Sequence, residues 1–196
     1  KAIHYFELAA NQNDSDSQNC LGYIYISGEY VSRDIGKAIH YYTLSANQNN
    51  VNAQYNLGLV YFTNEVISRN IDKSIHYLTM AANRNSKEAQ YNLGYLYATK
   101  KLNYDLAIKY SLLAANQNIQ LAYNVLGYVY LNIDINKSIK YYTLASDANI
   151  AESQFMLGDI YFDDKYGVKD VNKALYYYYL AAKNNISDAQ YNLGLI

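Results

Sequence analysis

The sequence predicts an all-α protein, a solenoid of antiparallel helix–turn–helix repeats. The first observation is that the pair Leu-Gly recurs along the 196 residues, with its glycine at Gly22, Gly58, Gly94, Gly127, Gly158 and Gly194. The second is that a small residue lies 19 positions before each of these leucines, at Ala2, Ala38, Ser74, Ala107, Ser138 and Ala174. The third is that proline is absent, which is typical of a chain made almost wholly of helices.

The spacing of these two signals predicts two helices in each repeat. The distance from small residue to Leu is constant, whereas the distance from each Gly forward to the next small residue is 16, 16, 13, 11 and 16. All length variation therefore falls in one connection. We name the segment around Leu-Gly helix A and the segment after the small residue helix B. The fixed turn from helix B to the next helix A sets the stacking, and the variable loop lies within the repeat.

The faces of both helices follow from period 3.6. Three residues after the small residue, helix B carries Tyr5, Tyr41, Tyr77, Tyr110, Tyr141 and Tyr177. Seven and eight residues after it, helix B carries only Ala or Ser, so that one face permits close approach of another helix. Three residues after its Gly, helix A carries Tyr25, Tyr61, Tyr97, Tyr130 and Tyr161. We expect Gly to provide a hollow and these tyrosines to pack on helix B.

The ends of helix B are marked by polar residues. Four residues before each internal small residue we expect an N-cap, at Asp34, Asn70, Asn103, Asp134 and Asp170. Eleven residues after each small residue stands an asparagine, at Asn13, Asn49, Asn85, Asn118, Asn149 and Asn185. Asn is the usual substitute for Gly in the left-handed conformation that ends a helix. We therefore expect these asparagines to stop helix B.

The chain is predicted to be a single repeat array over residues 1–196, without a linker or a second domain. Whole repeats are expected at 17–52, 53–88, 89–121, 122–152 and 153–188, with partial repeats at 1–16 and 189–196. Because both ends cut through a repeat, we expect a piece of a longer array.

Composition excludes several classes of function. Charged residues make up 17% of the chain, against about 25% on average, and the net charge is −1. This balance argues against a partner held by charge, such as nucleic acid or an anionic membrane. The single cysteine excludes an intrachain disulfide and, with no signal-peptide pattern, favours the cytoplasm over secretion. No apolar run approaches about 18 residues, so membrane insertion is not expected.

These residues resemble the Sel-one-like repeat family, a branch of the tetratricopeptide-repeat superfamily. The family pattern is visible as Ala53-Leu57-Gly58-Tyr61, then as Asp170-Lys173-Ala174-Tyr177-Ala181-Ala182. The resemblance covers the whole chain and implies a right-handed superhelix that acts as a protein–protein adaptor. The sequence departs from the family in three ways. Asn replaces the helix-ending Gly, the repeats at 89–121 and 122–152 are short, and the cysteines of the secreted branch are missing.

The resemblance also implies a binding surface, because helix A lines the concave side in tetratricopeptide relatives. The positions concerned lie three before the Gly and one and four after it. With two asparagines two before the Gly, the candidate partner-binding residues are Tyr23, Tyr55, Asn56, Phe62, Tyr91, Asn92, Tyr95, Tyr128, Phe155 and Phe162. Helical geometry places the first two positions near 60° and 100° from the Gly, opposite the Leu and Tyr expected to face helix B, near 260° and 300°.

The expected partner is a protein or peptide segment, neutral and with apolar anchors. The three groove positions carry no Lys or Arg, and Asn56 and Asn92 could bind an extended backbone. The alternative for any one of these tyrosines is packing between repeats. Alternatives for the whole chain are a structural spacer within a larger protein, an RNA-binding helical repeat, and an enzyme that binds or hydrolyses β-lactams. The missing basic stripe and nucleophile–base pair count against the last two.

Residues that suggest chemistry have simpler explanations, so no catalytic residue, metal or cofactor is expected. His4, His40 and His76 recur every 36 residues on the side of helix B away from the core. Cys20 is expected to be a half-buried packing residue. The run 13–16 resembles the start of a calcium loop but is better explained by capping. The tyrosine run 176–179 contains Tyr177, which we expect in the core, and Asp163 with Asp164 is expected in a solvated loop.

Overall fold

The computed structural model describes residues 2–63, 70–100 and 102–196. Within these ranges the regular structure is helical and no strand occurs, so the predicted all-α class is confirmed. The chain forms two compact units, residues 1–90 and 91–196, with their boundary inside the helix α6 (Lys87–Thr99).

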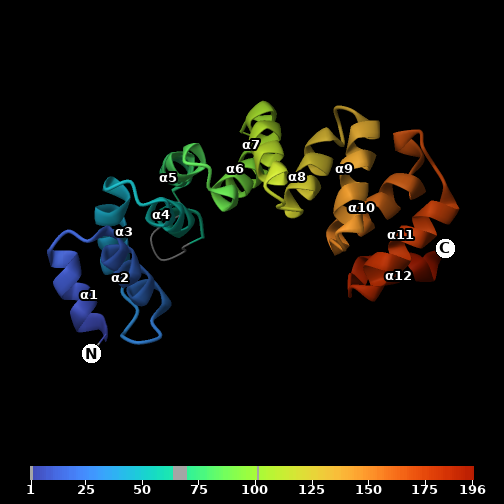
Figure 1. Ribbon diagram of the computed structural model, residues 1–196. Helices are drawn as coiled ribbons and strands as arrows, with labels where there is room; N and C mark the ends of the chain where they lie inside the picture. The colour runs from blue at the N-terminus through green and yellow to red at the C-terminus, as the bar shows by residue number, and fades with distance from the viewer. Residues whose placement is uncertain (1, 64–69, 101) are drawn as a thin grey trace. The chain divides into compact units, whose positions relative to one another are not determined.

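The helices alternate between the two predicted types (Figure 1). Helices A are α2 (Ser15–Ser27), α4 (Val51–Thr63), α6 (Lys87–Thr99), α8 (Leu121–Tyr130), α10 (Ala151–Phe162) and α12 (Ser187–Leu195). Helices B are α1 (Ala2–Asn11), α3 (Ile35–Asn47), α5 (Ile71–Asn83), α7 (Tyr104–Asn116), α9 (Ile135–Asp147) and α11 (Val171–Lys183). A short 3₁₀ turn, η1 (Asp164–Tyr166), lies in the loop after α10.

Each internal helix B begins at the N-cap that the sequence predicts. The side chains of Asp34 and Asn70 accept hydrogen bonds from the backbone N–H groups of Lys37 and Lys73, three residues on, at 2.9 Å. Asn103, Asp134 and Asp170 make the same bond in the second unit. Each bond satisfies one first-turn N–H that the helix itself leaves unpaired.

Each helix B ends at the predicted asparagine. All six of these residues have φ between 61° and 68°, and within the described ranges they are the non-glycine residues with positive φ. The backbone N–H of Asn49 donates to the carbonyl of Ala46 at 3.0 Å, and that of Asn50 donates to Ser45 at 3.2 Å. This pairing satisfies the last carbonyl groups of the helix and turns the chain into the next helix A.

The asparagine side chains also join successive repeats. In the second unit, Asn184 donates from Nδ2 to Oδ1 of Asn149 and to Oε1 of Gln154, both at 2.9 Å. Gln154 is 2% exposed, and its Nε2 donates to Oδ1 of Asn149 at 3.2 Å. In the first unit, Gln48 links to Asn13 and Gln18 in the same manner. The residue that ends one repeat therefore fixes the next repeat through side-chain amides.

Helix A and helix B meet at the Leu-Gly pair. A Cβ added to Gly22, Gly127 or Gly158 would lie 2.4–2.5 Å from a ring carbon of Tyr42, Tyr142 or Tyr178. These tyrosines are at most 2% exposed and stand four residues after the small residue of helix B. The hollow at Gly is therefore confirmed, and the residue that fills it follows the tyrosine named from the sequence. Leu78 and Ser111 fill the same space beside Gly58 and Gly94.

The tyrosines three after the Gly pack on helix B as expected. Each stacks on the tyrosine three after the small residue, with ring centroids 5.6–6.1 Å apart and planes within 14°. The pairs are Tyr25–Tyr41, Tyr61–Tyr77, Tyr97–Tyr110, Tyr130–Tyr141 and Tyr161–Tyr177. In four of them a lysine ammonium lies 5.0–5.2 Å from the helix A ring. Such aromatic pairs contribute about 0.5–1.5 kcal/mol each beyond the area they bury.

We predict that Asn149→Ala lowers the free energy of unfolding by about 1–2 kcal/mol. Alanine at φ 61° carries the left-handed strain and also loses the amide contacts with Gln154 and Asn184. The measurement is urea unfolding followed by circular dichroism. Asn149→Gly is the control, because it relieves the strain and removes the same contacts. Equal stability of the two variants would show that the left-handed geometry costs nothing here.

We predict that Gly158→Ala destabilises the chain by about 1–3 kcal/mol, because the new methyl group overlaps the buried ring of Tyr178. Gly194→Ala is the matched control in the same unit, since nothing lies within 4 Å of a Cβ added there. Thermal unfolding of both variants measures the difference. A Gly158→Ala variant that melts with the wild type would contradict the close contact.

Candidate functional site

Of the candidate binding residues, Tyr23, Tyr95 and Tyr128 lie on the side of helix A that faces away from its helix B, here called the helix A surface. The leucine before each internal Gly is 0% exposed, whereas Tyr23, Tyr95 and Tyr128, one after the Gly, are 55%, 40% and 40% exposed. The predicted division of helix A into a packing face and an open face is therefore confirmed for these residues.

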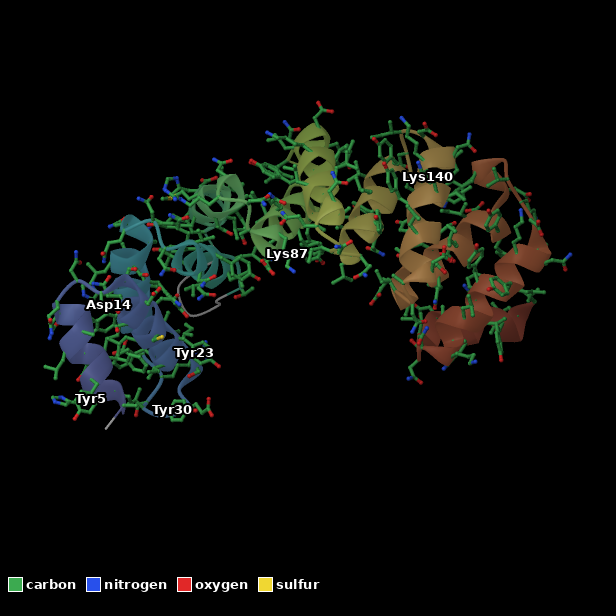
Figure 2. The ribbon with its side chains drawn as sticks, viewed as in Figure 1. Tyr5, Asp14, Tyr23, Tyr30, Lys87 and Lys140 are labelled. Atoms are coloured by element: carbon green, nitrogen blue, oxygen red, sulfur yellow. The ribbon has the colours of Figure 1, made fainter. Side chains whose placement is uncertain are left out.

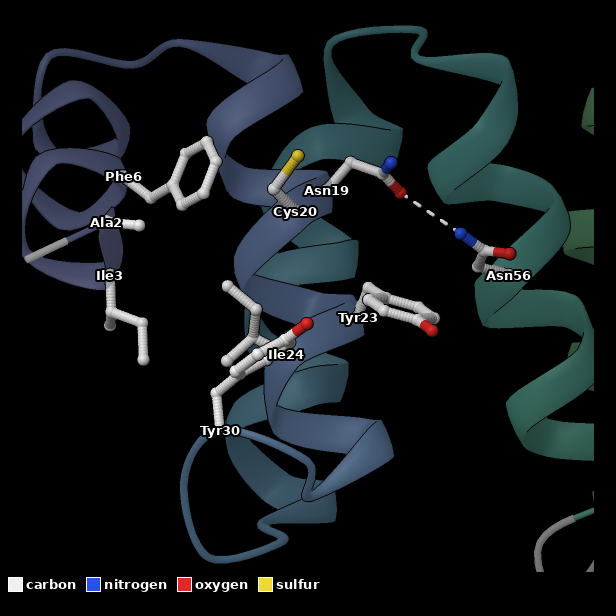
Figure 3. A pocket seen from close by; sticks show the side chains of 9 residues that line it. All are labelled: Ala2, Ile3, Phe6, Asn19, Cys20, Tyr23, Ile24, Tyr30 and Asn56. Atoms are coloured by element: carbon white, nitrogen blue, oxygen red, sulfur yellow. Dashed lines mark hydrogen bonds between the residues drawn. The ribbon is translucent and has the colours of Figure 1, made fainter.

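The helix A surface of the first unit includes an apolar hollow of about 730 Å³ between α1 and α2. Phe6 and Ile3 of α1 face Cys20 and Ile24 of α2 across it (Figure 3). Tyr23 lies at its edge, so one of the ten candidate residues contributes an aromatic ring to a concave part of the surface.

Two asparagines close the far side of this hollow. Asn56 on α4 donates from Nδ2 to Oδ1 of Asn19 on α2 at 3.2 Å (Figure 3). This bond occupies one of the amide hydrogens that the sequence analysis offered to a peptide backbone. Tyr55 and Phe62, the other candidates of this unit, are half-buried on α4.

Tyr30, which stands outside the repeated positions of helix A, also reaches the hollow from the loop after α2 (Figure 3). Tyr30 is 66% exposed, and Tyr5 of α1 is 68% exposed on the same unit (Figure 2).

Cys20 is half-buried, as expected, and burial raises the pKa of its thiol, with Asp16 and Asp14 acting in the same direction. A raised pKa is the opposite of what a thiolate nucleophile needs.

The helix A surface of the second unit contains a smaller hollow of about 220 Å³. Tyr95 of α6 and Tyr128 of α8 are two of its walls, and Met156 of α10 is a third. The buried ring of Tyr142, which fills the space at Gly127, forms part of the lining. Two candidate residues thus lie together on this surface, in a site assembled by three successive helices A.

Phe155 and Phe162 lie further along the second unit, against the buried Tyr178. Their ring centroids are 5.9 and 6.3 Å from that of Tyr178. Phe162 is 43% exposed and Phe155 is half-buried. The hydroxyl of Tyr178 donates to Oδ1 of Asp159 at 2.8 Å. Burial raises the pKa of Asp159 above its ordinary value, against this hydrogen bond and the charge of Lys165, which lower it.

Tyr91 and Asn92 are the remaining candidates, and both are half-buried on α6. Tyr91 packs against two apolar clusters, one that includes Ala115 of α7 and one that includes Val125 of α8. Its truncation would disturb this packing as well as the surface. Tyr91 therefore packs between helices, which is the alternative to partner binding that the sequence left open for these tyrosines.

The structure differs from the sequence analysis over the run 176–179. Tyr178 is the fully buried ring, at 1% exposed, whereas Tyr177 is half-buried in its stack with Tyr161. The position itself could be identified in the sequence, because it lies four residues after the small residue in every helix B. It was hard to recognise, since that residue is Phe, Tyr, Leu or Ser.

The histidines and the aspartates of the loops, which could in principle take part in catalysis or metal binding, make local contacts within the fold. His4, His40 and His76 are exposed, and each lies against the tyrosine that follows it at 5.0–5.7 Å. Asp14 caps α2 by accepting from Ser17 at 2.7 Å, as the capping interpretation predicted. Asp163 accepts from the backbone of Lys165 and begins η1.

The described residues also bear on metal binding and on membranes. Among the residues that the structure describes, no group of three His, Cys, Asp or Glu side chains is placed to hold a metal ion. No helix in these ranges has both the length and the hydropathy needed to cross a bilayer.

The chain matches a family model described as Sel1 repeat over its whole length. The matched segments are residues 1–14, 15–50, 51–86, 87–119, 120–150, 151–186 and 187–196. Each matched repeat after the first starts two residues before the corresponding predicted repeat, close to the first residue of its helix A.

Solved structures share this fold. A protective antigen of uropathogenic Escherichia coli strains that displays an SLR fold is 25% identical, with a TM-score of 0.82 over 99% of this chain and 43% of its own. A Sel1 repeat protein from Oxalobacter formigenes is 33% identical, with a TM-score of 0.74 over 94% of this chain and 78% of its own. A putative Sel1 repeat protein from Klebsiella pneumoniae, 16% identical with a TM-score of 0.58 over 98% of this chain and 97% of its own, agrees in fold alone.

The chain thus spans less than half the length of the Escherichia coli antigen. No curated protein matches the sequence significantly.

We predict that Asp159→Asn raises the free energy of unfolding at neutral pH. A folded-state pKa above the unfolded value means that the charged carboxylate disfavours the fold, and this penalty disappears as the pH falls through the folded pKa. The amide keeps an acceptor for the hydroxyl of Tyr178. Urea unfolding at pH 7 and near pH 4 should show a stabilisation that shrinks in acid. A variant less stable than the wild type at pH 7 would contradict the inferred penalty.

Proposed function

The chain belongs to the Sel1 repeat family, and from this premise we propose that it is a scaffold that binds peptide segments of other proteins on its helix A surface. Sel1 repeat proteins are generally protein-interaction scaffolds. The proposal includes a single repeat array over residues 1–196 and action by binding rather than by catalysis. We propose the same scaffold role for any longer protein of which this chain is a part.

The observation that carries the proposal is the exposure of large aromatic side chains at one repeated position of helix A. Tyr23, Tyr95 and Tyr128 all stand one residue after the Gly, and each lines a hollow. Tyrosine offers a large contact area, a polar tip and little rotamer freedom to lose on binding. In the second unit, Tyr95 and Tyr128 line the same preformed hollow, an arrangement that suits an extended segment better than a small molecule.

The helix A surface fits a partner that carries apolar side chains. The hollow of the second unit is lined by Ala98, Val125 and Met156 together with the rings of Tyr95 and Tyr128. A bound segment would therefore gain most from apolar anchors placed between polar backbone contacts.

We predict that Tyr95→Ala combined with Tyr128→Ala weakens partner binding about tenfold or more, because aromatic anchors dominate binding free energy. Both side chains are 40% exposed, so their loss should leave the helical content unchanged. The measurement is affinity capture with the intact chain, read by mass spectrometry and followed by titration of the captured proteins. These positions give a cleaner test than Tyr55 with Tyr91, because Tyr91 also packs between helices.

The matched control is Tyr176→Ala combined with Tyr179→Ala. These tyrosines lie in the same unit, on a helix B, and are 57% and 55% exposed. The proposal requires that partners be lost from the first double variant and kept by the second. Identical sets of partners from both would exclude the helix A surface and favour a spacer or a helix B contact.

A further inference from the structure

The hollow of the second unit has the size of a side-chain pocket. Its volume is about 220 Å³, below the range of about 300–1,000 Å³ typical of pockets for whole small ligands. Tyr95, Tyr128, Met156 and Val125 line it with mainly apolar atoms. Such a space accepts one large apolar side chain.

The sequence explains why the pocket occurs in this repeat. The position four after the Gly is Ala98 in α6, whereas the other whole repeats place a large side chain there, Ile26, Phe62, Leu131 and Phe162. Ala98 is fully buried in the lining. Because a methyl group replaces a larger side chain at this point, room remains between α6 and α8.

One charged group lies at the pocket. Glu152, in the first turn of α10, is the sole acidic or basic residue among those that line the pocket. It is exposed, and within the described ranges no lysine or arginine forms an ion pair with it. The neighbouring Ser153 accepts a hydrogen bond from Nδ2 of Asn124 at 2.7 Å, which ties α10 to α8 at this wall.

We propose that this pocket selects a peptide segment in which a large apolar residue lies beside a Lys or Arg. The apolar side chain enters between Tyr95 and Tyr128, and the cationic group pairs with Glu152. This inference rests on the proposed function and refines it, because a strictly neutral partner was expected from the groove positions. It names the chemistry of one anchor of the bound segment.

The test is selection of a phage-displayed library of short random peptides on the 196-residue chain. Enriched peptides should share an apolar residue next to a basic one. Affinities of a selected synthetic peptide are then measured for Thr99→Phe, which fills the pocket from its exposed rim, and for Glu152→Gln. We expect a loss of about tenfold or more for the first. For the second we expect a loss of about two- to fivefold, which disappears at high salt.

The chain offers matched controls for both variants. Thr63 occupies the position of Thr99 in α4, and each hydroxyl donates to the carbonyl four residues earlier. Glu88 occupies the position of Glu152 in α6. Thr63→Phe and Glu88→Gln should bind the peptide as the wild type does, which separates the pocket from general effects of a new ring or a lost charge.

The outcomes separate the two proposals. If the peptide loses affinity for the Tyr95 and Tyr128 double variant but binds Thr99→Phe and Glu152→Gln normally, the pocket inference is overturned and the proposed function stands. If none of these variants affects binding, the pocket inference is overturned, and affinity capture decides the proposed function. A library that yields no peptide with an apolar–basic pair also overturns the pocket inference, while the proposed function keeps its own test by affinity capture.

Discussion

The left-handed asparagine at the end of each helix B is the constraint on which the repeat depends. It ends the helix, directs the chain into the next helix A, and bonds to side chains of the following repeat, as Asn149 does with Gln154 and Asn184. In a chain without proline, this one backbone conformation sets how each helix pair meets the next. The loop inside each repeat does not set the stacking of successive repeats, and its length can therefore vary.

The second constraint is the contact at Gly, where two helices approach as closely as a ring allows. The buried rings of Tyr42, Tyr142 and Tyr178 hold helix B against helix A and leave the opposite side of helix A uncovered. The exposed tyrosines are therefore a consequence of the packing. Because Leu before Gly must face inward, the residue after it, such as Tyr128, must face outward.

The sequence was sufficient for features set by local hydrogen bonds at fixed spacing. The N-caps and left-handed asparagines could all be predicted, since a cap depends on residues three or four apart. The residue filling the Gly hollow could not be predicted as readily, because Tyr, Leu and Ser serve there. The pocket at Tyr128 requires three helices and the loss of one side chain at Ala98, so only the assembled structure reveals it.

The turn geometry has a chemical consequence for a chain so rich in asparagine. Asparagine deamidates when the backbone nitrogen of the next residue attacks the side-chain carbonyl and closes a succinimide ring. Here that nitrogen is already committed, since the N–H groups of Asp14, Asn50 and Ile186 donate to helix carbonyls at 3.1–3.2 Å. Breaking this bond means unwinding the end of helix B. Deamidation at these sites should therefore be slow in the folded array, and its rate should depend on how often the turns open.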